Sequence, residues 1–197
     1  MHLRPVGADA LLLEVDSPLD WFAALDAERS AGRLAVVDIV PGARTVLLDG
    51  VPDPAALAAR LRDLAIDPAA VPHSPPLVLD VVFDGVDLPF VADHAGSSVA
   101  EVVAALTGTE LTVAFCGFAP GFAYLRGLPW SVPRRPTPRT RVPAGSVALA
   151  AEFAGIYPTP SPGGWHIVGH SDAELFSVDR TPPALLTPGR TVRFRAA

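Results

Sequence analysis

The sequence predicts an α+β protein with two domains: a small N-terminal ferredoxin-like α/β layer over residues 1–76 and a C-terminal β-barrel over residues 77–197. Three observations support this prediction. Helical and β-rich runs alternate in the N-terminal part. A stretch with four prolines, residues 67–76, then separates the two parts. Beyond Gly117 the helical periodicity disappears and Gly and Pro interrupt short β-rich runs, which is typical of a closed or nearly closed barrel.

The N-terminal domain is predicted from two helices and three β-rich runs. Residues 11–15 form an apolar run, and Ser17-Pro18 then gives a helix start with Ser at the cap and Pro in the first turn. Residues 34–40 and 45–48 flank Pro41-Gly42, which predicts a hairpin. Asp53-Pro54 opens a second helix.

The C-terminal domain begins with a strand, a short helix and a second strand, predicted over residues 77–83, 97–106 and 109–116. After Gly117 only short β-rich runs remain. The clearest of them cover residues 146–150, 166–168 and 191–194.

The composition excludes several classes of function. The net charge of −6 gives no basic footprint for nucleic acid. The chain has no lysine, which excludes a Walker A lysine, a Schiff base and covalent biotin. The apolar runs are too short to span a membrane, and the N-terminus has no signal-peptide pattern. Cys116 is the single cysteine, so no intrachain disulfide can form, and we expect a cytoplasmic protein.

Residues 117–125 combine aromatic side chains, glycines and a proline directly after a strand. Glycines allow a close approach of the backbone, and aromatic rings can wall an apolar pocket. One interpretation is a substrate site; the other, which composition alone favours, is a loop whose rings cap the core. The candidate substrate-binding residues are Phe118, Pro120, Phe122 and Tyr124.

Residues 133–146 carry four arginines among four prolines, which predicts an extended loop. Guanidinium groups bind carboxylate or phosphate in a bidentate manner, so an anion site is one interpretation. A solvated loop, or one paired with acids of another protein chain, is the alternative. The candidate residues are Arg139, Arg141 and Ser146.

Residues 155–165 are a third informative segment. Backbone amides at Gly163 and Gly164 could form a small anion-binding nest, and Tyr157, Ser161 and Trp165 supply hydrogen-bond donors. The alternative is a long barrel loop with its turn residues. The hypothesis to test is that Arg139, Ser146, Tyr157, Ser161 and Trp165 line one pocket.

Other chemistry is weakly indicated. His166 and His170 share a strand face, but no third ligand is near them, so we expect no metal site. Cys116 lies in an apolar strand and is expected to pack rather than react. Asp84 and Asp87 flank a turn and are interpreted as turn residues.

Taken together, the motifs G-F-A-P-G-F-A-Y-L, P-R-R-P-T-P-R-T-R-V-P-A-G-S-V and G-I-Y-P-T-P-S-P-G-G-W-H-I-V-G-H resemble the KipI-like family, also described as the 5-oxoprolinase B subunits or allophanate hydrolase subunit 1. The likeness is dense over residues 97–194. The sequence departs from the family pattern at Phe153, Ala154, Arg190 and near Thr107.

The resemblance implies a cyclophilin-like barrel and membership of an ATP-dependent amidohydrolase complex that opens 5-oxoproline to glutamate. It implies a KipA-like barrel partner (the C subunit of such complexes, or allophanate hydrolase subunit 2), a LamB-type partner (their A subunit), a small anionic substrate, and ATP with Mg in the complex. Arg139, Ser146 and Tyr157 are the catalytic candidates. Inhibition of a sensor histidine kinase, or a carboxyltransferase-like role in urea or allophanate metabolism, are the alternatives.

Overall fold

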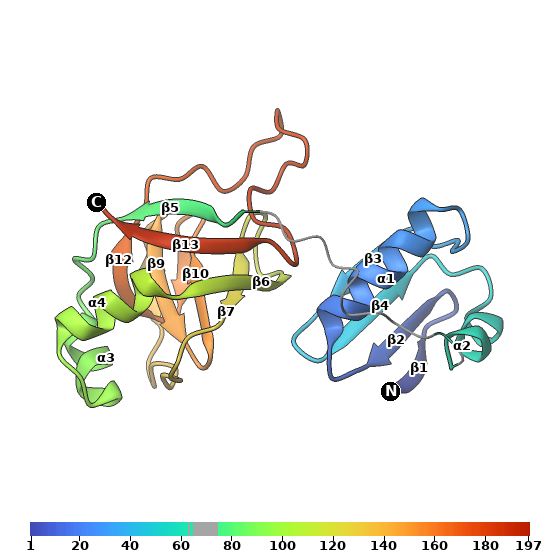
Figure 1. Cartoon of the computed structure of the whole chain (residues 1–197), viewed down its shortest axis with the longest axis horizontal. Coiled ribbons are helices and arrows are strands. Elements are labelled where there is room, and N and C mark those ends of the chain that lie inside the picture. Colours follow the sequence, from blue (N-terminus) through green and yellow to red (C-terminus); the bar gives the residue numbers. More distant parts are fainter. Residues whose placement is uncertain (63, 65–74) are drawn as a thin grey trace. The chain divides into compact units, whose positions relative to one another are not determined.

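The computed structural model describes residues 1–62, 64 and 75–197. The chain divides into two compact units, Met1–His73 and Ser74–Ala197 (Figure 1). The predicted junction at residues 67–76 falls largely outside the described residues.

The N-terminal unit is an α+β layer built on a four-stranded antiparallel sheet. The sheet order is β1-β2-β4-β3, and the predicted hairpin is the β3–β4 pair. The element order ββαββα differs from the βαββαβ order of a ferredoxin-like unit, because one strand precedes β2 and no strand follows α2 among the described residues of this unit. The elements are β1 (His2–Val6), β2 (Ala10–Glu14), α1 (Pro18–Ser30), β3 (Asp38–Pro41), β4 (Thr45–Asp49) and α2 (Pro54–Arg62).

Alternation along the strands of this unit builds its core. Leu11 and Leu13 of β2 point to the same face as Val46 and Leu48 of β4, and all four are fully buried. The helix α1 adds Leu25 to the same core. The sheet therefore has one apolar face, and the helices supply the second layer.

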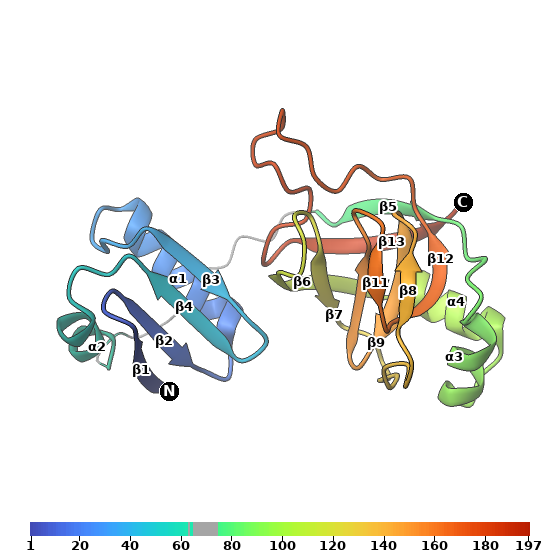
Figure 2. The ribbon, with the colours of Figure 1, turned by 180° about the vertical axis from the view of Figure 1, so that it is seen from behind.

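The C-terminal unit contains a seven-stranded sheet in the order β12-β9-β10-β7-β6-β13-β5 and a two-stranded sheet of β11 and β8. Figure 2 shows the small sheet on the side turned away from the viewer in Figure 1. The helices are α3 (Leu88–Ala95) and α4 (Val99–Gly108). The strands are β5 (Leu77–Val81), β6 (Glu110–Cys116), β7 (Ala123–Arg126), β8 (Arg139–Val142), β9 (Ser146–Ala150), β10 (Phe153–Ile156), β11 (Ser161–Gly163), β12 (His166–His170) and β13 (Thr191–Ala196).

The two edges of the seven-stranded sheet meet just beyond β5. Val82 and His170 exchange two backbone hydrogen bonds of 2.9 Å, and the amide of Gly85 donates to the carbonyl of Val168 at 3.2 Å. These bonds join the chain after β5 to β12, so the sheet is nearly closed into a barrel. Only β13 and β5 pair in parallel among the described strands. The prediction of a mostly antiparallel barrel is therefore confirmed at the level of the sheet.

The predicted short helix is α4, and its start follows from the sequence. The hydroxyl of Ser98 accepts a hydrogen bond from the amide of Glu101, and the Glu101 carboxylate accepts one from the amide of Ser98. Val102 and Leu106 are buried on one side of this helix. The preceding helix α3 was not predicted, because its eight residues are too few for a clear period.

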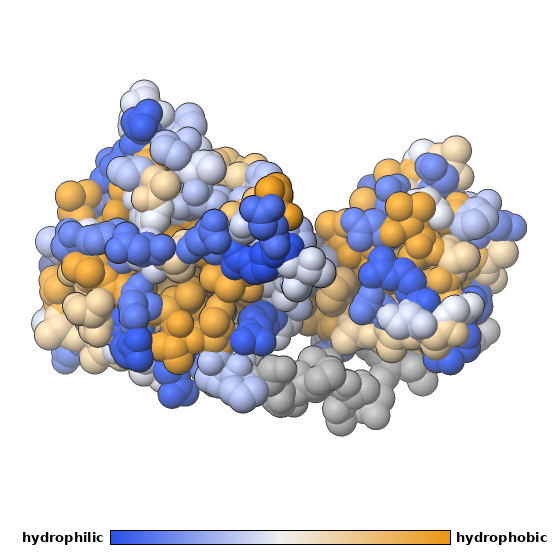
Figure 3. Space-filling view, turned by 90° about the horizontal axis from the view of Figure 1, so that it is seen from above, coloured by the Kyte–Doolittle hydropathy of each residue, from blue (hydrophilic) through white to orange (hydrophobic). Residues whose placement is uncertain are grey.

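The surface of the C-terminal unit is mixed in character. Figure 3 shows hydrophobic residues gathered between bands of hydrophilic ones on one of its faces. None of the helices within the described residues is long and apolar enough to cross a membrane.

The closure of the barrel depends on the absence of a side chain at Gly85. A Cβ atom there would lie 2.2 Å from the Val168 carbonyl carbon. We expect Gly85→Ala to lower the free energy of unfolding by at least about 3 kcal/mol, since the backbone on both sides has to separate. The measurement is urea denaturation followed by circular dichroism.

The matched control is Gly108→Ala, because a Cβ atom at that position meets nothing within 4 Å. It should leave stability unchanged or raise it by about 0.5–1 kcal/mol. Equal stability of the Gly85→Ala variant and the wild type would show that the closure is looser than the structure indicates.

Candidate functional site

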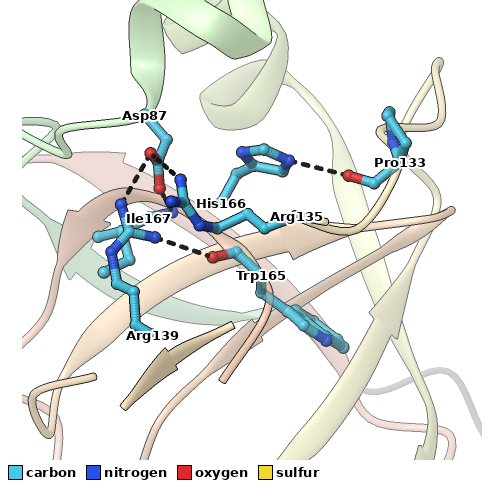
Figure 4. A network of polar contacts seen from close by, with 7 residues as sticks. All are labelled: Asp87, Pro133, Arg135, Arg139, Trp165, His166 and Ile167. Carbon is cyan, nitrogen blue, oxygen red and sulfur yellow. Dashed lines mark hydrogen bonds and ion pairs between the residues drawn. The ribbon is translucent and has the colours of Figure 1, made fainter. Parts of the chain in front are cut away.

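A buried carboxylate organises one end of the barrel. Asp87, 7 % exposed, directly precedes α3. Its Oδ1 atom accepts hydrogen bonds from Arg135 Nη1 at 3.0 Å and Arg139 Nη2 at 2.9 Å, and its Oδ2 atom accepts the amide of Ile167 at 2.7 Å (Figure 4). Asp87 lies in a turn, as predicted, and its side chain also joins this turn to two distant segments, which the sequence did not indicate.

The environment of Asp87 keeps this carboxylate ionised. Burial by itself would raise its pKa. The hydrogen bonds from Arg139 and from the Ile167 amide, together with the charges of Arg139 and Arg135, act in the other direction, and the net pKa lies below the ordinary 3.8.

The charges of this cluster do not balance. Arg135 and Arg139 share the single carboxylate of Asp87, and neither forms an ion pair with a second acid in the described part of the chain. Their side chains are 30 % and 22 % exposed, so solvent can reach them. An excess positive charge that is partly desolvated favours the binding of an anion.

His166 lies beside this cluster and is uncharged. Its Nε2 atom is 2.9 Å from the carbonyl of Pro133, and since a carbonyl only accepts, Nε2 carries the proton. The Nδ1 atom is buried and has no hydrogen-bond partner within the described residues. Burial is the largest cause that lowers the pKa of His166 below 6.5, and the neighbouring arginine charges also lower it. The His166 ring stacks on that of Phe90 of α3, with 4.4 Å between the ring centroids and 9° between the ring planes.

Contacts from α3 and β12 hold the arginine segment in place. His94 of α3 is 3.1 Å from the carbonyl of Ser131, and His166 of β12 binds the carbonyl of Pro133. The amide of Arg135 donates to the carbonyl of Gly164 at 2.9 Å. Val132 and Ala151 also exchange two backbone hydrogen bonds, and Asp87 binds Arg135 and Arg139. The segment over residues 131–139 is thus held by contacts along its length rather than being a free solvated loop.

A cluster of aromatic rings adjoins the arginines. The ring centroid of Phe122 lies 5.4 Å from that of Tyr157 and 5.5 Å from that of Trp165, and both pairs are edge to face. Tyr124 contacts Trp165 at 5.5 Å. Phe118 contacts Phe122 and Tyr157 at 5.3 and 6.2 Å. The sequence interpretation of core-capping rings fits the buried Phe122, but it does not fit Phe118, which is 62 % exposed.

Tyr157 connects the rings to the arginines. A Cβ atom on Gly163 would lie 2.3 Å from the Tyr157 hydroxyl, and Gly163 pairs with Arg139 across β11 and β8. Burial raises the pKa of Tyr157, and the charges of Arg134 and Arg139 oppose that rise only in part. The phenol is therefore protonated at neutral pH and can donate a hydrogen bond but cannot act as a base.

The structure brings several of the predicted residues together. Arg139, Tyr157, Gly163 and Trp165 are neighbours, and Arg139 Nη1 lies 3.5 Å from the carbonyl of Trp165. The Ser161 hydroxyl, on β11, is buried without a described partner.

Other predicted residues are less clearly placed at this cluster. Ser146 is buried on β9, where its carbonyl accepts the amide of Tyr157 at 3.0 Å. Arg141 and Pro120 are exposed, and the carbonyl of Gly164 accepts the hydrogen bond from the amide of Arg135. A single pocket lined by Arg139, Ser146, Tyr157, Ser161 and Trp165 remains a prediction.

Asp87, Arg135 and His166 were not among the predicted site residues. A partial signal existed for Asp87, since an acid followed by Leu-Pro is typical of a helix start. No group of three potential metal ligands occurs within the described residues. His170 is exposed, with Nδ1 3.0 Å from Asp84, and a register shift within β12 separates it from His166. Cys116 is partly buried, which raises its pKa.

Replacing Asp87 by Asn should destabilise the C-terminal unit. The change leaves two partly buried arginines without a counter-charge, and we expect a loss of roughly 2–3 kcal/mol, less than for a fully buried pair because both guanidinium groups meet solvent. The pKa of Asp87 is lowered in the fold, so this stability is present above pH 3.8 and is lost as pH falls through the folded value. Urea denaturation at pH 7 and pH 3 tests both statements.

Asp84→Asn is the matched control for Asp87→Asn. Asp84 lies on the same connection but is exposed and contacts only His170 among the described residues. A surface contact of this kind contributes at most about 1 kcal/mol. Similar losses in the two variants would contradict the assigned role of Asp87.

His166 should make the stability depend on pH in a second, separate range. Its pKa is lowered in the fold, so its unfolded form takes up a proton first. The contribution is therefore complete above pH 6.5 and declines as pH falls below that value. We expect His166→Gln to flatten the stability curve between pH 7 and pH 5. An identical slope in the variant and the wild type would contradict the buried neutral state of His166.

Comparison with known proteins assigns this chain to a family. Residues 1–186 match the family described as carboxyltransferase domain, subdomain C and D. The B subunit of 5-oxoprolinase from Escherichia coli O157:H7 is 39 % identical over 203 residues, which cover 96 % of this chain and 93 % of that protein. The Haemophilus influenzae protein of the same name is 43 % identical over 112 residues, covering 56 % of this chain and 53 % of that protein.

The crystal structure of TTHA0988 matches with a TM-score of 0.80 and 32 % identity, and the match covers the whole of this chain. This chain spans 41 % of the length of TTHA0988. The chain therefore belongs to the carboxyltransferase-domain family that contains the 5-oxoprolinase B subunits.

Proposed function

We propose that this chain is one component of an ATP-dependent amidohydrolase complex that opens 5-oxoproline to glutamate. A relative that matches over almost its whole length is named as the B subunit of 5-oxoprolinase. The structural observation that best supports the proposal is the excess positive charge of Arg135 and Arg139, of which Arg139 lies close enough to Tyr157 for its charge to act on the phenol. 5-Oxoproline is a small ring with one carboxylate, so it needs a cation and an apolar surface close together.

The reaction converts 5-oxoproline, ATP and water into glutamate, ADP and phosphate. Coupling to ATP provides the driving force by phosphorylating the lactam oxygen, which makes a stable amide carbon a better electrophile. In this proposal Arg139 binds the substrate carboxylate, with the excess charge shared with Arg135. Tyr157, a protonated donor, stabilises negative charge that develops on oxygen.

The described residues do not by themselves make a nucleotide site, and neither Asp87 nor Tyr157 is free to act as a base. The sequence has no lysine, and the described residues contain no cluster of three metal ligands to hold Mg. Asp87 is committed to its arginines, and Tyr157 is protonated. We therefore assign no residue of this chain to ATP and expect partners to supply that part of the site, namely a KipA-like barrel protein and a LamB-type protein.

The proposal predicts activity only in the complex. This chain, co-expressed with a KipA-like and a LamB-type protein, should release glutamate from 5-oxoproline in an ATP-dependent manner, and the purified single chain should not. Arg139→Gln should weaken substrate binding by about 1–3 kcal/mol, the range for losing a hydrogen bond to a charged group, and so raise KM by about 5- to 150-fold. Glutamate release with 5-oxoproline, allophanate and urea compared is the measurement.

Arg195→Gln is the matched control for Arg139→Gln. Arg195 also pairs with one aspartate, Asp80, but both side chains are exposed on β13 and β5. It should leave KM unchanged. Full turnover by the single chain would refute the need for partners. Preference for allophanate or urea would favour a role in that pathway, and a chain that binds no partner protein of this kind would favour the kinase-inhibitor function.

A further inference from the structure

Phe118 has a backbone conformation that a bulky residue rarely adopts. Its φ angle is +69°, and the only other non-glycine residue with a positive φ in the described chain is Ala151. The amide of Ala119 donates to the carbonyl of Gly117 at 2.8 Å, which closes a three-residue γ-turn around Phe118. The positive-φ form of this turn is strained for an L-residue with a side chain.

The surrounding loop imposes this conformation. The amide of Phe122 donates to the carbonyl of Ala119 at 2.9 Å, and the amide of Gly117 donates to the carbonyl of Phe122 at 3.3 Å. Gly121, with φ +84°, packs so closely that a Cβ atom there would lie 2.9 Å from Phe176 Cβ. The turn is therefore determined by bonds and contacts on both sides of Phe118, and the strain cannot relax locally.

The ring that this turn presents is poorly buried. The Phe118 side chain is 62 % exposed, whereas Phe122 and Tyr157, the two rings it meets edge to face, are each 2 % exposed. Both the backbone and the apolar side chain are thus in unfavourable states in the free chain. Strain of this kind concentrates at sites where a ligand is bound.

We propose that Phe118 is a ligand-contacting residue whose strained turn holds its ring ready to cover the apolar face of a small cyclic carboxylate. This inference rests on the proposed function. The ring meets Tyr157, whose hydroxyl lies beside Gly163, the pairing partner of Arg139. Tyr157 therefore contacts the Phe118 ring and lies within range of the charge of Arg139. The carboxylate of the ligand faces the arginines, and its ring faces Phe118.

Two substitutions at one position separate strain from contact. Phe118→Ala removes the ring but keeps a side chain at positive φ, whereas Phe118→Gly removes both the ring and the strain. In the purified co-expressed complex we expect Phe118→Gly to melt about 3 °C above Phe118→Ala. Both variants should bind 5-oxoproline at least about 10-fold more weakly than the wild type by isothermal titration calorimetry, because both lack the ring.

Ala151→Gly is the matched control. This substitution relieves the backbone strain at the other non-glycine residue with a positive φ, in the turn between β9 and β10. It should not lower the melting temperature or change the affinity for 5-oxoproline. Size-exclusion chromatography of each complex shows whether its component chains remain associated.

Several results would overturn the inference. Unchanged affinity for 5-oxoproline in both Phe118 variants would show that the ring does not touch the ligand. A wild-type complex that does not bind 5-oxoproline would also contradict this contact. Dissociation of the complex in both variants would show that Phe118 docks a partner protein instead. A lower melting temperature for Phe118→Gly than for Phe118→Ala would contradict the strain.

The inference and the proposed function fail in different ways. A wild-type complex that binds 5-oxoproline through Phe118 but does not release glutamate would uphold the inference and reject the hydrolase function. A complex that hydrolyses 5-oxoproline with the same KM in the wild type and both variants would uphold the hydrolase function and reject the role of Phe118.

Discussion

The C-terminal unit depends on one buried carboxylate at the point where its sheet closes. Asp87 and Ile167 are joined twice, by a backbone hydrogen bond of 3.0 Å and by the bond from the Ile167 amide to the Asp87 side chain. This pair continues the contacts that begin with Val82 and His170 and bring the two sheet edges together. The same carboxylate binds Arg135 and Arg139, so the closure of the barrel and the position of the arginine segment are parts of one arrangement.

The electrostatics of the site follow from that arrangement. One carboxylate serves two guanidinium groups, which leaves a positive charge partly exposed to solvent. His166 remains neutral beside them, since burial and the arginine charges both oppose its protonation. Tyr157 remains protonated because burial dominates its pKa. The cluster can therefore bind an anion and donate hydrogen bonds, whereas neither Asp87, which is held by its arginines, nor the protonated Tyr157 is free to accept a proton.

Stability and binding make opposite demands at Phe118. A glycine would suit the γ-turn better, and burial would suit the ring better, yet the sequence keeps an exposed phenylalanine there. At Asp87 the two demands coincide, since the bonds that close the barrel also position the arginines. Variants at these two positions should therefore differ in kind: changes at Asp87 lower stability and affinity together, whereas Phe118→Gly lowers affinity while it relieves strain.

The sequence by itself determined the elements that local pattern controls. These include the β3–β4 hairpin around Pro41-Gly42, the short helix α4, and a barrel composed of Gly- and Pro-punctuated strands. It also identified the three segments that carry most of the candidate residues. Only the tertiary structure decided which of these residues meet. Asp87 is 52 residues from Arg139 and 80 from Ile167 in the chain, so no local period or spacing reveals their contact. The sequence therefore showed which chemical groups were available. The closing of the sheet sets the distances between groups that are far apart in the chain. It therefore determined that Asp87 binds both Arg135 and Arg139, and that the two positive charges exceed the one negative charge.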